Sequence, residues 1–91
     1  MIYIDPPQTR FVKRRGEYLG TSHLISDQSV EELHAFVAKM GLSRRGFHDK
    51  PGQPHYDLLE GMVEDALAHG AKQVTTREII RLLKQQYGSS K

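Results

Sequence analysis

The sequence predicts a single small α/β domain over residues 1–91, in which a short, mainly parallel sheet of about three strands packs with three helices. The chain of 91 residues is long enough for one hydrophobic core but not for two. Short apolar runs also alternate with three amphipathic segments, which is typical of layered α/β folds. The alternative is a mostly helical bundle with a marginal β-ribbon.

Three short apolar segments are the candidate strands. Residues 1–4 alternate apolar side chains and stop before two prolines, which cannot donate to a sheet. Residues 23–26 and 71–74 are the other two candidates. Residues 8–20 mix basic and apolar side chains, so this segment could be a loop or a weak hairpin.

Capping pairs mark the starts of three predicted helices. In each pair a Ser, Thr or Asp precedes a Glu by three residues, which is the spacing of a capping box or a related N-cap. Apolar side chains at helical spacing follow each pair, and Gly41 and Gly70 are expected to end the first and second helices. The three pairs are Ser29 with Glu32, Asp57 with Glu60, and Thr75 with Glu78.

The composition excludes several functional classes. The chain has no cysteine, which excludes disulfides, Cys-ligated zinc and a thiol nucleophile. No run approaches the roughly 18 apolar residues of a membrane span, and no early segment resembles a signal peptide. We therefore expect a cytoplasmic protein with no membrane partner. The net charge of +2 is too small to identify a nucleic-acid binder, so that partner is only weakly supported.

The predicted parallel strands would bring several polar residues to one edge of the sheet. Asp5 follows the first strand, Ser26 and Asp27 end the second, and residues 75–77 follow the third. Ligands of open parallel sheets bind outside these carboxyl ends. The helices that begin at Ser29 and Thr75 would add backbone N–H groups that favour an anion.

The polar stretch of residues 42–56 is long for a connection, and long loops are often functional. Its basic, imidazole and phenol groups suit a phosphate or carboxylate ligand. Its histidines lie seven positions apart, which matches no metal-binding spacing, so we predict no metal site. A mixed His/Asp site would still be possible. The candidate residues here are Arg44, Arg45, His48, His55 and Tyr56, followed by Asp57.

Structural roles compete with these functional ones. The Ser, Thr and Asp residues at helix starts could be caps and nothing more. His34 flanks the apolar face of the first helix and could be a half-buried, hydrogen-bonded histidine. The basic run over residues 10–15 could be a solvated charge cluster or could bind an acidic partner or nucleic acid.

An ordered series of short motifs covers nearly the whole chain. They are Tyr3-Ile4-Asp5-Pro6-Pro7, Ser22-His23-Leu24 with Ser26-Asp27, Glu32-Leu33-His34-Ala35-Phe36, Arg44-Arg45 with Phe47-His48, Pro54-His55-Tyr56-Asp57, and Gly70-Ala71 with Val74 and Arg77-Glu78. With these motifs the chain resembles the bacterial and phage family called domain of unknown function 4031. The resemblance implies a small α/β domain whose recurring polar residues share one site, and it implies no activity. Residues 8–18 depart from the family pattern, which has a tryptophan there.

The leading hypothesis is a domain that binds a phosphorylated small molecule, such as a nucleotide or a nucleotide-derived signal, with no identified cofactor. The first alternative is a small phosphoesterase or nuclease in which His23, His55 or Asp27 is catalytic, with or without a metal. The second alternative is an interaction module that uses Arg10 to Arg15. A homodimer is possible. The predicted ligand-binding residues are Asp5, His23, Ser26, Asp27, His34, Arg44, Arg45, His48, His55, Tyr56, Asp57 and Arg77.

Overall fold

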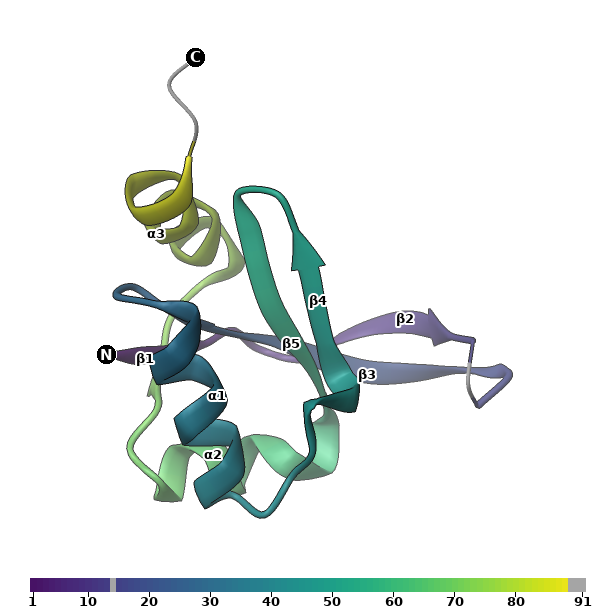
Figure 1. Ribbon diagram of the computed structural model, residues 1–91. Helices are drawn as coiled ribbons and strands as arrows, with labels where there is room; N and C mark the ends of the chain where they lie inside the picture. The colour runs from purple at the N-terminus through teal and green to yellow at the C-terminus, as the bar shows by residue number, and fades with distance from the viewer. Residues whose placement is uncertain (14, 89–91) are drawn as a thin grey trace.

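A computed structural model describes residues 1–13 and 15–88 and shows one six-stranded sheet with three helices (Figure 1). This confirms the predicted α/β class and the number of helices, whereas the prediction of about three strands is wrong. The strands are β1 (Ile2–Ile4), β2 (Gln8–Val12), β3 (Glu17–Ser26), β4 (Phe47–Lys50), β5 (Gln53–Leu59) and β6 (Lys72–Gln73). The helices are α1 (Val30–Lys39), α2 (Val63–Ala68) and α3 (Thr76–Tyr87), with 3-10 turns at Arg44–Gly46 and Glu60–Met62.

The sheet is mixed and mostly antiparallel, so the prediction of a mainly parallel sheet is also wrong. Its strand order is β4-β5-β3-β1-β6, and β2 pairs with β3 on the same side as β1. Within the described residues, β1 and β6 form the single parallel pair. Short turns join β2 to β3 and β4 to β5, and a short turn can only connect antiparallel strands.

The long central strand β3 pairs with two segments along one edge. Its C-terminal end pairs with β1 and its N-terminal half pairs with β2. Pro6 and Pro7 lie between these two segments, where their missing N–H groups interrupt the ladder. The β2–β3 ribbon extends away from the helices, as Figure 1 shows in purple and blue. Of the two alternatives predicted for residues 8–20, a loop or a hairpin, the structure shows the hairpin, formed by β2 and the first part of β3.

The predicted polar loop of residues 42–56 is wrong, because most of it forms the β4–β5 hairpin. Pro51 and Gly52 make the turn, and Gly52 has φ +74°, which suits the third position of a type II turn. Asp57 lies inside β5 and caps no helix, and α2 begins only at Val63. The alternation of buried and less buried side chains along β5 prevailed over the helix-cap spacing of Asp57 and Glu60.

The caps predicted for the first and third helices are confirmed. The Ser29 hydroxyl accepts a hydrogen bond from the Glu32 N–H at 3.0 Å, and the Thr75 hydroxyl accepts one from the Glu78 N–H at 3.1 Å. Gly41 follows α1 with φ +80°, a conformation that glycine adopts without steric cost. None of the helices in the described part of the chain is long and apolar enough to cross a membrane.

The two faces of the sheet have different roles. On one face Leu24, Tyr56 and Leu58 pack with α1 and α2 in the larger core cluster. On the other face α3 covers only one end of the sheet, where Ile25 packs with Ile79 and Leu83. Side chains alternate between faces along each strand. Side chains of neighbouring strands that point away from the main core therefore form a strip on this second face, which α3 covers only in part.

Candidate functional site

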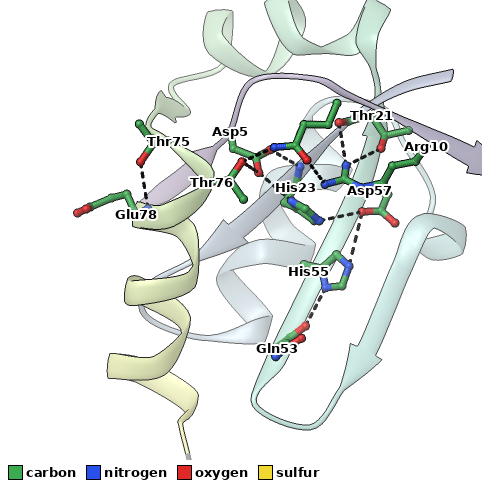
Figure 2. Close-up of polar contacts among 11 residues, drawn as sticks. Asp5, Arg10, Thr21, His23, Gln53, His55, Asp57, Thr75, Thr76 and Glu78 are labelled. Carbon is green, nitrogen blue, oxygen red and sulfur yellow. Dashed lines mark hydrogen bonds and ion pairs between the residues drawn. The ribbon is translucent and has the colours of Figure 1, made fainter.

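Three histidines and two aspartates gather on this strip. His23 of β3 pairs directly with Asp57 of β5, and His48 of β4 pairs directly with His55 of β5. Directly paired residues point to the same face of a sheet, which is why these side chains converge. Asp5 follows β1 beside His23, and its N–H donates to the His23 carbonyl. Figure 2 shows Asp5, His23, His55 and Asp57 arranged as one polar group.

Asp5 is the buried anchor of this group. Its side chain has 0% exposure and accepts hydrogen bonds from the backbone N–H of His23 at 2.7 Å, from His23 Nδ1 at 2.8 Å and from the Thr76 hydroxyl at 2.9 Å. Burial alone would raise the pKa of Asp5, but these bonds outweigh it and hold the pKa below the ordinary value. Asp5 is therefore ionised at neutral pH.

The contact with Asp5 orients the ring of His23. Because an ionised carboxylate can only accept, the proton of this hydrogen bond belongs to Nδ1 of His23. The other ring nitrogen, Nε2, faces the Asp57 Oδ1 atom at 4.0 Å. Metal-binding histidines usually donate one ring N–H to a carboxylate or carbonyl, which leaves the other ring nitrogen free to face the metal. The contact of His23 with Asp5 has this form.

His55 is oriented in the same way by the backbone. Its Nδ1 atom donates to the Gln53 carbonyl at 2.8 Å, which leaves Nε2 to face the Asp57 Oδ1 atom at 3.5 Å. Burial lowers the pKa of His55 against the opposing effects of the Gln53 bond and Asp57. The neutral ring is therefore favoured, and in this form Nε2 carries a lone pair and no proton.

Asp57 Oδ1 lies between these two nitrogens without a hydrogen bond. The atom is buried, and neither histidine contact has hydrogen-bond geometry. The three facing atoms of His23, His55 and Asp57 all lie within 4.8 Å of one another. Two ligands of a tetrahedral zinc ion, each about 2.1 Å from the metal, would lie roughly 3.4 Å apart. We call these three residues the His/Asp centre.

His48 is the exposed neighbour of the His/Asp centre. Its Nε2 atom lies 3.0 Å from the second carboxylate oxygen of Asp57, and its ring stacks on His55 with centroids 4.9 Å apart. Its side chain is 46% exposed, against 10% for His55. His48 is therefore open to solvent while it contacts a residue of the centre.

Two hollows meet at the centre. A groove of 850 Å³ runs between α3 and the β4–β5 turn, and its wall includes His23, His55 and Thr76. On the other side lies a cleft of 690 Å³, which we call the basic cleft. A ligand in either hollow would reach the centre from the open face. Residues that line the basic cleft include Arg10, Lys13, Arg15, Thr21, His48 and Asp57.

Ser26 and Asp27 lie at the opposite end of the β1–β3 pair from Asp5. The predicted common edge required parallel strands, but β1 and β3 are antiparallel, so their carboxyl ends lie apart. The Ser26 hydroxyl bonds the Glu32 carboxylate and accepts from the N–H groups that lead into α1. The Asp27 carboxylate lies 3.1 Å from the Met1 amino group. Both residues therefore stabilise the start of α1 and the N-terminus, and neither contributes to the group around Asp5.

His34 and Tyr56 lie on the other face of the sheet. His34 Nδ1 and the Tyr56 hydroxyl are 2.6 Å apart, and the two rings pack edge to face beside Phe47. Tyr56 is 1% exposed and belongs to the main core. The structure therefore places this pair on the face that packs against α1 and α2, opposite the face that carries the His/Asp centre.

The predicted anion-binding arginines also lie outside the centre. Arg44 and Arg45 occupy the 3-10 turn before β4, and Arg77 is an exposed residue in the first turn of α3. Within residues 1–13 and 15–88 none of the three has a side-chain hydrogen bond or ion pair to the centre. Arg45 lines a small separate hollow with Tyr56 and Asp57.

Three polar residues beside the centre were not among the predicted ligand-binding residues. They are Gln8 and Arg10 of β2 and Thr76 of α3, of which Figure 2 labels Arg10 and Thr76. The sequence placed Arg10 only in the basic run and residue 76 only at the predicted edge of the sheet. Gln8 and Arg10 lie two positions apart on β2 and so share one face of the sheet, but residues 8–12 show no alternation of polar and apolar types that would have signalled this. Arg14, part of the predicted basic run, lies outside the described residues.

The stability of the metal-free protein is expected to fall as the pH drops below about 6.5. Burial and then Arg44 lower the pKa of His34, and burial lowers that of His55. The unfolded chain then binds more protons than the folded chain below the ordinary histidine pKa, so acid favours unfolding. Urea unfolding in EDTA at pH 7.5 and pH 5.5 measures this, and His34→Gln should reduce the difference. Equal or greater stability at pH 5.5 would contradict the lowered pKa values of His34 and His55.

Comparison with known proteins gives one match. A family model described as a protein of unknown function (DUF4031) matches residues 2–86 of the chain. No curated protein and no solved structure matches the chain significantly.

Proposed function

The chain belongs to the DUF4031 family, a name that assigns no activity, and we propose from the site itself that the domain is a hydrolase built around one divalent metal ion. The observation that carries this proposal is the buried, unpartnered Oδ1 atom of Asp57, which faces Nε2 of both His23 and His55. Lone pairs on two imidazole nitrogens and a carboxylate oxygen that face one another repel, and a proton or a metal cation among them relieves the repulsion. A divalent metal ion removes this repulsion.

The donor set favours a transition metal of the zinc type. Two imidazole nitrogens and one carboxylate oxygen suit Zn²⁺ or Fe²⁺ better than Mg²⁺, which prefers oxygen ligands and keeps several waters. Three protein ligands leave at least one position for water, as in catalytic zinc sites. Asp5 and the Gln53 carbonyl supply the outer support, because each fixes the far nitrogen of one histidine.

The chemistry that this arrangement supports is hydrolysis. A bound divalent metal lowers the pKa of a coordinated water and so supplies a nucleophile at neutral pH. In hydrolysis of an ester, water oxygen forms the new bond, the bond to the leaving oxygen breaks, and the water proton ends on the leaving group. We assign His48 to carry this proton, because it is exposed and contacts Asp57.

Isothermal titration of the EDTA-treated protein with Zn²⁺ tests the proposal. We expect one equivalent to bind, and Asp57→Asn to weaken binding by at least about 100-fold because it removes the charge of a direct ligand. His69→Ala is the matched control, since His69 follows α2 and its side chain contacts Asp65 and Phe36, away from the centre. It should bind zinc like the natural sequence.

Two results would contradict the proposal. One is a protein that takes up no zinc, manganese or iron, and the other is equal loss of binding in Asp57→Asn and His69→Ala. Hydrolysis of p-nitrophenyl phosphate by the zinc-loaded protein separates an enzyme from a domain that only binds a phosphorylated small molecule, which was the leading hypothesis from the sequence. The bacterial or phage source, the homodimer and the cytoplasmic location stay predictions.

A further inference from the structure

We propose that Arg10 forms a phosphate-binding subsite next to the His/Asp centre, so that the substrate is a phosphate ester. This inference rests on the proposed function and names its substrate class. It departs from the sequence-based expectation, which assigned phosphate binding to Arg44, Arg45 and Arg77.

Arg10 is a half-buried cation held entirely by neutral groups. Its Nη1 atom donates to the carbonyl and the hydroxyl of Thr21 at 3.1 and 2.9 Å, and its Nη2 atom donates to Gln8 Oε1 at 2.9 Å. No ion pair among the described residues includes Arg10. A guanidinium has five N–H donors, so the three bonds leave two for another acceptor.

The charge around Arg10 suits a phosphate more than a single carboxylate. Arg10, Lys13 and Arg15 all line the basic cleft, and Asp57 of the His/Asp centre lines the same cleft. A phosphoryl group in this cleft would share it with the guanidinium of Arg10 and with Asp57, one of the residues that would hold the metal. Paired clamping by an arginine and a metal ion is a common way to stabilise the charge of a transferring phosphoryl group.

A continuous chain of hydrogen bonds joins Arg10 to the centre (Figure 2). Gln8 Oε1 accepts from Arg10, and Gln8 Nε2 donates to the Thr76 hydroxyl at 2.9 Å. That hydroxyl donates to Asp5, which in turn accepts from His23 Nδ1. Gln8 and Thr76 each accept one hydrogen bond and donate another along this chain, so Arg10 is oriented relative to His23 before any ligand binds. Preorganisation of this kind strengthens binding, because little ordering is left to do.

Titration of the zinc-loaded protein with phenyl phosphate tests the subsite. Arg10→Gln should weaken phenyl phosphate binding by at least about 10-fold, because a hydrogen bond to a charged group is lost. Arg10→Lys keeps the charge but loses the fork of donors, so it should recover only part of the affinity. Zinc affinity should stay unchanged in both variants. Arg81→Gln is the matched control, because Arg81 lies on α3 and pairs with Glu78.

The outcomes separate this inference from the proposed function. If zinc binds but Arg10→Gln and Arg81→Gln hold phenyl phosphate equally well, the subsite is wrong and the metal centre stands. If benzoate binds as tightly as phenyl phosphate, the site takes a carboxylate and the phosphate assignment is wrong. If no metal binds, the proposed function fails. Phosphate binding by the metal-free chain that depends on Arg10 would then still support the subsite, and its absence would overturn it.

Discussion

Replacing Asp5 with asparagine is expected to lower the free energy of unfolding by about 3 kcal/mol, since breaking a buried, fully paired carboxylate leaves its partners without an ionic acceptor. The side chain has 0% exposure and accepts three hydrogen bonds. The asparagine amide would face at least one donor of His23 or Thr76 instead of accepting from it. In a domain of this size the melting temperature should fall by roughly 15 °C.

The same substitution should also weaken zinc binding. Loss of the carboxylate that fixes His23 Nδ1 is expected to reduce the affinity roughly 10- to 100-fold. Urea unfolding in EDTA and zinc titration measure the two effects separately. Asp65→Asn is the matched control, because the Asp65 side chain is 53% exposed and its pairing with His69 should contribute little. Surface substitutions usually change the free energy of unfolding by less than about 1 kcal/mol. If Asp5→Asn and Asp65→Asn differed by no more than this, the role of Asp5 would be contradicted.

Replacing Leu24 with alanine is expected to cost about 3 kcal/mol of stability on the opposite face of the sheet. Leu24 has 0% exposure and pairs in register with Ile4 on one side and Tyr56 on the other. Truncating such a side chain removes buried apolar surface and leaves a cavity that β3 cannot close, because strands on both sides hold it in place. A domain of this length has a total stability of about 5 to 13 kcal/mol, so the loss is a large share.

Urea unfolding in EDTA measures the effect of Leu24→Ala, with Ile80→Ala as the matched control. Ile80 is 51% exposed on α3, so its truncation should change the free energy of unfolding by less than about 1 kcal/mol. Equal effects of the two substitutions would mean that Leu24 is less tightly packed than the structure shows. The zinc affinity of folded Leu24→Ala should stay close to normal, because Leu24 points away from the His/Asp centre.

The parts of the fold that depend on local signals could be predicted from the sequence. The hydroxyls of Ser29 and Thr75 each satisfy a backbone N–H three residues on, so the starts of α1 and α3 were readable. The direction of strand pairing could not be predicted in this way, because it depends on which distant segments of the chain meet. The β4–β5 hairpin was not predicted, because its prolines are typical of loops. The overlooked signal was the alternation of His55, Asp57 and Leu59 with the buried Tyr56 and Leu58.

The same limit explains what was and was not predictable about the site. Asp5, His23, His48, His55 and Asp57 were all candidates, because acidic and imidazole groups are recognisable without a fold. Their grouping was expected at the carboxyl ends of parallel strands, yet it arises from cross-strand neighbours on one face. Arg10 was predicted only as part of a basic segment for an acidic partner or nucleic acid. Its place beside the centre depends on Thr21 and Gln8, whose contacts follow from the register of β2 on β3.

The hydrogen bond between Thr76 and Asp5 joins positions 71 residues apart, and this has a consequence for the order of folding. Contacts between distant positions form late, because closing a long loop costs chain entropy and slows folding. The β2–β3 and β4–β5 hairpins join near neighbours and can form early. On the ribosome, His23, His48, His55 and Asp57 are all synthesised before Thr76. We therefore expect the ligands of the centre to meet first, and the arrival of α3 to lock His23 in its final orientation.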